Sequence, residues 1–283
     1  MFDFNSESKR SMNHIAEGKA GRISSISTQT RVGINILFGV KQLHDIGFVH
    51  RDLKPANVAV GRENTPEYRF FHILDFGLAR EFVVIGGDKK LQMRRPRPKA
   101  LFRGTTRYCS INTHDKGEQG RVDDLWSVLY MLAEMRGTLP WANLREKKDI
   151  NDMKKRTFHE VLLKNSPVQL VNFARHLDTL NYYSHPDYAR LHGYLMEIMK
   201  AGKFNRFTDP YDWETKKKME KRKTETVSII PTTIKKDNTQ GTCSLNVPVP
   251  ATGHPKKKQS IMLGATEENP FPAEWFRTNP LGF

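Results

Sequence analysis

Apolar side chains recur at helical spacing early in the chain. After about 22 polar residues without a sustained period, four apolar residues follow one another three or four positions apart, which predicts an amphipathic helix. They are Val32, Ile36, Val40 and Leu43. Ser27 or Thr28 offers an N-cap, and we expect the helix to end near His44, ahead of a turn at Gly47.

The stretch from Asp124 to Met135 is apolar on nearly every side of a helix. A helix of that kind must be surrounded by protein, so we expect it at the centre of the folded domain. Shorter patterns predict helices over residues 158–163, 167–177 and 186–199 and strands over residues 58–60 and 70–74. The predicted fold is therefore mostly α, with a few short β-strands.

The composition changes after Trp213. Lysine-rich runs at residues 216–218, 221–223 and 256–258 are set among Thr, Pro, Asn and Gly. Such a stretch cannot bury enough apolar surface to fold, so we expect a basic, largely disordered tail over residues 215–283. This leaves an irregular segment over residues 1–22 and one folded domain over residues 23–214.

The net charge of +15 raises the question of a nucleic-acid partner. No zinc spacing, basic zipper or RNA-binding aromatic motif accompanies the charge, so we do not expect one. No apolar run approaches the ~18 residues of a membrane span, and the start is not a signal peptide. The two cysteines lie far apart in the sequence, which favours a reducing compartment. We expect a protein of the cytoplasm or nucleus without a membrane partner.

One eight-residue stretch carries the strongest chemical signal. Residues 50–57 read His-Arg-Asp-Leu-Lys-Pro-Ala-Asn, between a predicted helix and a predicted strand, and Asp-Phe-Gly follows at residues 75–77. These two motifs, in this order, are typical of protein kinases. In that pattern Asp52 is the catalytic base, and Asn57 and Asp75 are the magnesium ligands. Lys54 is placed to reach the transferring phosphate of ATP.

Beyond these motifs, the chain resembles the casein kinase 1 superfamily, and most closely its tau-tubulin kinase branch, from about Ile23 to Glu214. The stretches that carry the likeness are residues 47–50, 74–80, 102–108, 123–127, 139–141, 186–188 and 211–214. Where most protein kinases have Ala-Pro-Glu, residues 110–112 read Ser-Ile-Asn, a departure that the casein kinase 1 group shares.

The resemblance implies a protein-kinase-like large lobe, with the short strands around the catalytic loop. It further implies a serine/threonine protein kinase that uses ATP and magnesium on protein substrates, cytoskeletal ones among them. By the same resemblance Thr105 would bond to Asp52 and Lys54. Asp124 would brace the catalytic loop from the central helix.

The segment that follows Asp-Phe-Gly has an unusual composition. Between Phe76 and Gly104 there is no Ser, Thr or Tyr, so no phosphate added there can pair with Arg51. We therefore expect activity that does not depend on phosphorylation of this segment. The segment and its flank are instead basic, through Lys89, Lys90, Arg94, Arg95, Arg97, Lys99, Arg103 and Arg107. These charges could select acidic or already phosphorylated substrates, or they could form a solvated loop that recognises nothing.

A protein kinase also needs a small lobe with a Gly-rich loop and a strand-borne lysine. Residues 18–21 read Gly-Lys-Ala-Gly, which lacks the required glycine spacing, and no candidate lysine is found. We therefore expect the small lobe to be missing, as in a fragment of an active kinase. Two alternatives stay open. One is a catalytically impaired scaffold that binds substrates or partners, and the other is a microtubule or nucleic-acid binder that acts through the basic tail.

Overall fold

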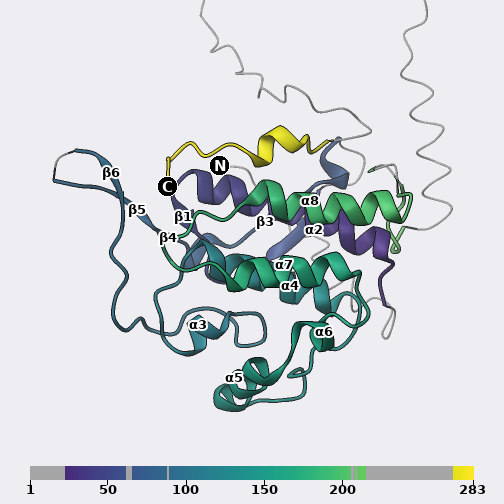
Figure 1. Ribbon diagram of the computed structural model, residues 1–283, viewed down its shortest axis with the longest axis horizontal. Coiled ribbons are helices and arrows are strands. Elements are labelled where there is room, and N and C mark those ends of the chain that lie inside the picture. The colour runs from purple at the N-terminus through teal and green to yellow at the C-terminus, as the bar shows by residue number, and fades with distance from the viewer. Residues whose placement is uncertain (1–22, 62–65, 88, 205–206, 208, 215–269) are drawn as a thin grey trace, which may run out of the picture. The chain divides into compact units, whose positions relative to one another are not determined.

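The computed structural model describes residues 23–61, 66–87, 89–204, 207, 209–214 and 270–283. Helices dominate this part of the chain, and the strands are two or three residues long (Figure 1). The longer helices are α2 (Ile26–Asp45), α4 (Arg121–Glu134), α5 (Lys147–Arg156), α7 (Val168–Asp178) and α8 (Tyr188–Ala201). The expectation of a helix-rich fold with few short strands is confirmed.

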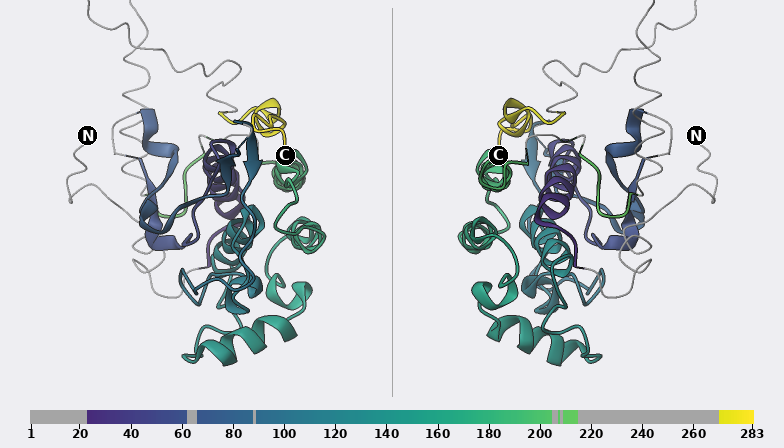
Figure 2. Two further views of the ribbon diagram at one scale, coloured as in Figure 1. Left: turned by 90° about the vertical axis from the view of Figure 1, so that its left-hand side faces the viewer. Right: turned by 90° about the vertical axis from the view of Figure 1, so that its right-hand side faces the viewer.

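The core forms where α2, α4 and α8 pack together. Val32 and Leu37 of α2, Leu129 of α4 and Leu195 of α8 are all inaccessible to solvent or nearly so. Figure 2 shows α2 in the middle of the molecule, with α8 on one side and the strands β2 and β3 on the other. Almost all of α4 is buried, as expected from a stretch that is apolar on nearly every side of a helix.

The N-terminus of α2 differs from the sequence-based expectation. Ser25 is the N-cap, because its side chain accepts a hydrogen bond from the backbone N–H of Thr28, and the helix already begins at Ile26. The proposed caps Ser27 and Thr28 lie inside the first turn. Several hydroxyl residues compete for the cap position here, and the sequence alone does not rank them.

Three antiparallel strand pairs shape the loops around the end of α2. The strands β1 (Phe48–Val49) and β4 (Arg80–Glu81) pair, as do β2 (Val58–Val60) with β3 (Phe71–Ile73) and β5 (Val83–Ile85) with β6 (Leu91–Met93). The predicted strands at residues 58–60 and 70–74 correspond to β2 and β3. The first pair places the segment after Asp-Phe-Gly beside the start of the catalytic loop.

Several short elements complete the chain. The helices α3 (Ile111–His114) and α6 (His159–Leu162) flank α5, and α3 and α5 were not predicted. The 3-10 turns are η2 (Pro55–Asn57), η3 (Pro66–Arg69), η4 (Phe76–Leu78) and η5 (Ala273–Phe276). No helix in the described ranges is long and apolar enough to cross a membrane.

The end of the chain departs from the expected tail. Residues 270–283 are ordered, and their turn η5 packs against α2 and α8, where Phe271 and Phe276 are 3% and 1% exposed. Phe38 of α2 contacts both rings, with centroids 5.4 and 5.7 Å away. The apolar side chains of this short stretch are enough to hold it on the core, although the composition around it is that of a tail. Residues 1–22 and 215–269 lie outside the described residues, so the expectations of an irregular start, a missing small lobe and a disordered tail there stay predictions.

Candidate active site

The loop that carries the His-Arg-Asp motif begins where α2 ends. Gly47 makes the turn with a φ of +87°, and Arg51 also has a positive φ, of 70°. That conformation is unfavourable for a residue with a side chain, so something must hold it. The carboxylate of Asp124 does so, because it accepts the backbone N–H groups of His50 at 2.6 Å and of Arg51 at 2.8 Å. Asp124 therefore braces the loop from α4, as the resemblance implied.

The charge of Asp124 is itself supported by buried neighbours. Burial alone raises the pKa of this carboxyl group, but its hydrogen bond with His44 and the N–H of His50 bring the pKa below its usual value. Burial lowers the pKa of His44, so the neutral ring donates from Nε2 to Asp124 and accepts from the Tyr188 hydroxyl at Nδ1, 2.6 Å away. The loop is thus fixed to three helices by one buried polar chain.

Asp52, Lys54 and Thr105 come together at the centre of the site. One oxygen of Asp52 accepts from the Thr105 hydroxyl at 2.7 Å, and the other lies 2.7 Å from the ammonium of Lys54. Lys54 is also 3.4 Å from the Thr105 hydroxyl. The hydrogen bonds that the resemblance implied for Thr105 are therefore present. A carboxylate held between an ammonium and a hydroxyl is suited to orienting a substrate hydroxyl and accepting its proton.

Asn57 and Asp75 are brought side by side by the β2–β3 pair. The backbone N–H of Leu74 donates to the carbonyl of Asn57 at 2.8 Å, and Asp75 follows directly. The amide nitrogen of Asn57 donates to the Asp52 carbonyl at 2.9 Å, which leaves its amide oxygen for a metal ion. Asp75 is exposed, lies shortly after the end of β3, and has a φ of 62°.

This donor set fits magnesium. The ion prefers hard oxygen ligands and keeps several waters, so one amide and one carboxylate oxygen suit it when phosphate oxygens complete the shell. The described residues contain no cluster of three or more His, Cys, Asp or Glu that could hold a metal by itself. Asn57 and Asp75 would therefore hold magnesium together with a bound nucleotide, and Lys54 would face its phosphates.

Gly104 sets how closely the following segment approaches the catalytic loop. It has a φ of +110°, and a Cβ atom there would lie 2.5 Å from the Arg51 carbonyl oxygen. Only glycine fits this position without a shift of the backbone. Thr105, the partner of Asp52, is the next residue, so the close approach at Gly104 places the threonine.

Lys154 has a role at this site that the sequence did not indicate. Its ammonium donates to the carbonyl oxygens of Thr106 at 2.8 Å and Cys109 at 2.5 Å, and it lies about 5 Å from the ring centres of Tyr130 and Trp141. Burial lowers the pKa of Lys154 to about 8. This lysine anchors the chain just after Thr105. Its position four residues after Ile150, the other buried residue of α5, was the available signal.

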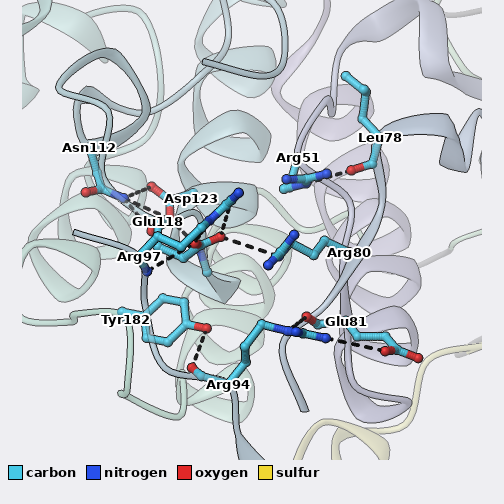
Figure 3. A network of polar contacts seen from close by, with 11 residues as sticks. Arg51, Leu78, Arg80, Glu81, Arg94, Arg97, Asn112, Glu118, Asp123 and Tyr182 are labelled. Atoms are coloured by element: carbon cyan, nitrogen blue, oxygen red, sulfur yellow. Dashed lines mark hydrogen bonds and ion pairs between the residues drawn. The ribbon is translucent and has the colours of Figure 1, made fainter. Parts of the chain in front are cut away.

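Some residues of the predicted basic cluster pair with carboxylates, and Figure 3 shows two of these pairs. Arg97 forms two hydrogen bonds with Glu118, and Arg94 lies 3.6 Å from Glu81. Arg107 donates to Glu134 on α4 at 2.7 Å. The other members of the predicted basic cluster are exposed, namely Lys89, Lys90, Arg95, Lys99 and Arg103. The basic residues therefore divide into a group that pairs with carboxylates and a group that is more exposed.

Comparison with known proteins gives a consistent picture. The family model of the protein kinase domain matches residues 6–181. A Caenorhabditis elegans protein named as a serine/threonine-protein kinase is 50% identical over 200 residues, which is 71% of this chain and 57% of that protein. An inactive tau-tubulin kinase of the same organism is 35% identical over 67% of each chain. A casein kinase I homologue of Kluyveromyces lactis is 32% identical over 68% of this chain and 37% of its own length.

Proposed function

This chain belongs to the protein kinase family, with casein kinase 1 and tau-tubulin kinase-like proteins among its relatives, and we propose that it transfers the γ-phosphate of ATP to Ser or Thr hydroxyl groups of proteins. The observation that carries the proposal is the contact of Asp52 with Thr105 and Lys54 at 2.7 Å each. Phosphate transfer to a hydroxyl group requires a carboxylate that is held in this way. The packing of the domain does not require it.

Each site residue has a defined part in the proposed reaction. Asp52 orients the attacking hydroxyl and accepts its proton, while Thr105 and Lys54 hold the carboxylate in place. Lys54 also offers its positive charge to the transferring phosphate. Magnesium, when bound with ATP, neutralises phosphate charge, and Asn57 and Asp75 supply its protein ligands.

We further propose that the substrates are acidic or already phosphorylated near the target residue. Lys89, Arg95, Lys99 and Arg103 are exposed on the segment that follows Asp-Phe-Gly, and this segment borders the site through Thr105. Guanidinium and ammonium groups at such a position attract carboxylates and phosphates. The tau-tubulin kinase name of one relative makes cytoskeletal proteins reasonable first substrates.

A non-catalytic scaffold is the alternative, because the same relative is named as inactive. The retained set of Asp52, Lys54, Asn57 and Asp75 favours catalysis, since binding a protein partner does not require it. The chain spans 57% and 37% of the length of two of the kinases that it matches, so the activity of a whole protein is part of the proposal. We expect efficient turnover only in a product that also carries a small lobe.

The test is phosphate transfer from ATP to a protein substrate, measured on the 283-residue chain and on the longest in-frame product of its transcript. We expect the product with both lobes to be active, and Asp52→Ala to lower kcat by roughly a thousandfold or more. The 283-residue chain alone should show negligible turnover. Robust, Asp52-dependent activity of that chain would refute the need for a small lobe, and an inactive two-lobe product would refute the proposed function.

A further inference from the structure

Three arginines gather beside the catalytic loop around a single glutamate. Arg51 comes from the His-Arg-Asp motif, Arg80 from β4 and Arg97 from the basic segment, and Figure 3 shows their side chains pointing toward one region. Glu118 lies in the loop before α4, and its side chain is only 2% exposed. These four residues, which we call the arginine cluster, come from four stretches of the chain that are separated in the sequence.

Glu118 is the centre of the cluster by geometry. Its carboxylate accepts Arg97 Nε at 2.5 Å and Nη2 at 2.9 Å, and it also accepts the backbone N–H of Arg97 at 3.2 Å. Arg80 Nε lies 3.6 Å from Oε1 of Glu118, the oxygen that also accepts Nη2 of Arg97. A forked pair of this kind fixes direction as well as distance. The basic segment is therefore fixed to the loop before α4 by hydrogen bonds, and β4 contributes an ion pair to the same carboxylate.

Glu118 is in turn fixed from behind. Asn112 donates to the Glu118 carbonyl at 3.0 Å and to the carboxylate of Asp123 in the first turn of α4. Arg51 completes the arrangement by donating to the Leu78 carbonyl at 2.6 Å, between Asp-Phe-Gly and β4. The arginine cluster thus connects the segment that follows Asp-Phe-Gly, at its start and in its middle, to the catalytic loop and to α4.

The charge balance of the cluster requires an anion. Burial and the guanidinium groups of Arg80 and Arg97 lower the pKa of Arg51, and the carboxylate of Glu118 opposes that shift. Burial alone raises the pKa of Glu118, but its hydrogen bonds with Arg97 bring the pKa below the usual value, so it stays ionised. Without this negative charge, three cations would face one another in a partly buried space.

We propose that Glu118 is a positioning residue, an internal anion that holds the segment between Asp-Phe-Gly and Thr105 in place where other kinases use a phosphate. The segment from Phe76 to Gly104 contains no hydroxyl residue that could carry that phosphate. A carboxylate built into the loop before α4 needs no second enzyme and is always present. This inference rests on the proposed function for its meaning, but the position of the segment can be measured without any kinase activity.

The test separates charge from shape at position 118. Glu118→Gln keeps the shape and removes the charge, whereas Glu118→Asp keeps the charge and shortens the side chain. Trypsin cleavage after Lys99 in the full chain, at a bond that is not followed by proline, reports how often the segment opens. We expect cleavage in Glu118→Gln to be faster by roughly tenfold or more, because the arginines then lack the negative charge that pairs with them. Glu118→Asp keeps that charge and should retain most of the protection against cleavage. A role in packing alone predicts the opposite order.

Two further variants control the experiment. Glu81→Gln removes an exposed carboxylate that pairs with Arg94 in the same segment, and its cleavage should stay within about twofold of the original chain. Arg97→Gln removes the partner of Glu118 at a side chain that is 40% exposed, so the domain should still fold and cleavage after Lys99 should accelerate. If Glu118→Gln does not fold, the cleavage rate of Arg97→Gln tests the role of Glu118 instead.

Equal protection in Glu118→Gln and Glu81→Gln would overturn the proposal, as would faster cleavage in Glu118→Asp than in Glu118→Gln. In an active two-lobe product, Glu118→Gln should lower kcat about tenfold while KM for ATP stays within about threefold, since the cluster holds the substrate side of the site. Phosphatase treatment should leave the original protein active. Absence of all activity would count against the proposed function alone, because the cleavage pattern still decides the role of Glu118.

Discussion

At the scale of single residues, the site depends on a close approach between backbone segments that leaves no room for a side chain. Gly104 approaches the Arg51 carbonyl so closely that a Cβ atom would lie 2.5 Å from the oxygen. The Arg51 carbonyl belongs to the backbone and cannot rotate away as a side chain could. Asp124 in addition holds Arg51 in the left-handed region. A change at Gly104 must therefore move Thr105 or the catalytic loop.

We expect Gly104→Ala to lower the free energy of unfolding by about 2–3 kcal/mol, through the clash and the φ of +110°. Denaturant unfolding of the purified chain measures this change. Gly193→Ala is the matched control, because its new Cβ meets nothing within 4 Å and lies in the helix α8. That variant should be stabilised by about 0.5–1 kcal/mol. Similar effects of the two substitutions would show that the close approach at Gly104 is unimportant.

Residues in adjacent positions carry the predicted chemistry of the site. Asp52 and Asn57 stand in one eight-residue motif, and Asp75 in a second, so residue type and spacing were enough to propose them. Glu118 and Lys154 escaped notice because a charged residue in a polar stretch is usually solvated. Their burial depends on segments about 20 to 50 positions away, and that information is not present in local spacing.

At the scale of elements, the longer apolar helices were predictable, whereas the polar helix α5 and the four-residue helix α3 were not. The sequence of α4 is apolar on nearly every side of the helix, and α8 has buried apolar residues at helical spacing. In contrast, α5 buries only Ile150 and Lys154, so its sequence resembles a loop. The turn η5 was hidden for a different reason. Phe271 and Phe276 are strong apolar signals, but the surrounding composition from residue 215 onward suggested an unfolded tail.

The contact between α8 and η5 should depend on pH. His192 of α8 stacks on Phe276, with ring centroids 3.9 Å apart and an interplanar angle of 8°. Burial lowers the pKa of His192 to about 4 from an ordinary value near 6.5, so the folded chain holds the ring neutral. Below pH 6.5 the unfolded chain takes up a proton that the folded chain refuses. The stability supplied by this group is therefore complete above pH 6.5 and falls as the pH decreases toward 4.

When the pH falls from 7 to 4.5, the free energy of unfolding of the unmodified chain should decrease by about 2–3 kcal/mol more than that of His192→Phe. This difference follows from the size of the pKa shift of His192. The variant keeps an aromatic stack on Phe276 and cannot be protonated. Denaturant unfolding at the two pH values gives both numbers, and the difference between the chains removes the contribution of other histidines. Parallel losses in the two chains would contradict the prediction.

At the scale of the whole molecule, the end of the chain is a structural part of the domain. Phe271 contacts Phe38, Phe70 and Phe207, at centroid distances of 5.4, 5.7 and 5.7 Å. Polar contacts fix the rest of the segment, because Lys41 donates to Thr278 at 2.6 Å and Arg121 donates to the Phe283 carbonyl at 2.6 Å. The last fourteen residues thus cover an apolar surface of α2 and α8.

Removal of residues 270–283 should therefore expose that surface. We expect a loss of about 2–4 kcal/mol in the free energy of unfolding, since two nearly buried phenylalanines contribute about 2–3 kcal/mol each and the ordering of the segment offsets part of this. The exposed aromatic patch should also promote association, which light scattering would detect. Phe271→Ala combined with Phe276→Ala should reproduce most of the loss without shortening the chain.

Glu274→Ala is the control for these changes, because Glu274 lies in the same turn and is exposed, so its removal should change stability by less than about 0.5 kcal/mol. A synthetic peptide of residues 270–283, added in excess to the truncated chain, should restore part of the stability by mass action. Restoration requires that the apolar surface of α2 and α8 keep its structure when the segment is absent. If the truncated chain unfolds at the same denaturant concentration as the original and stays monomeric, the segment rests on the domain without stabilising it.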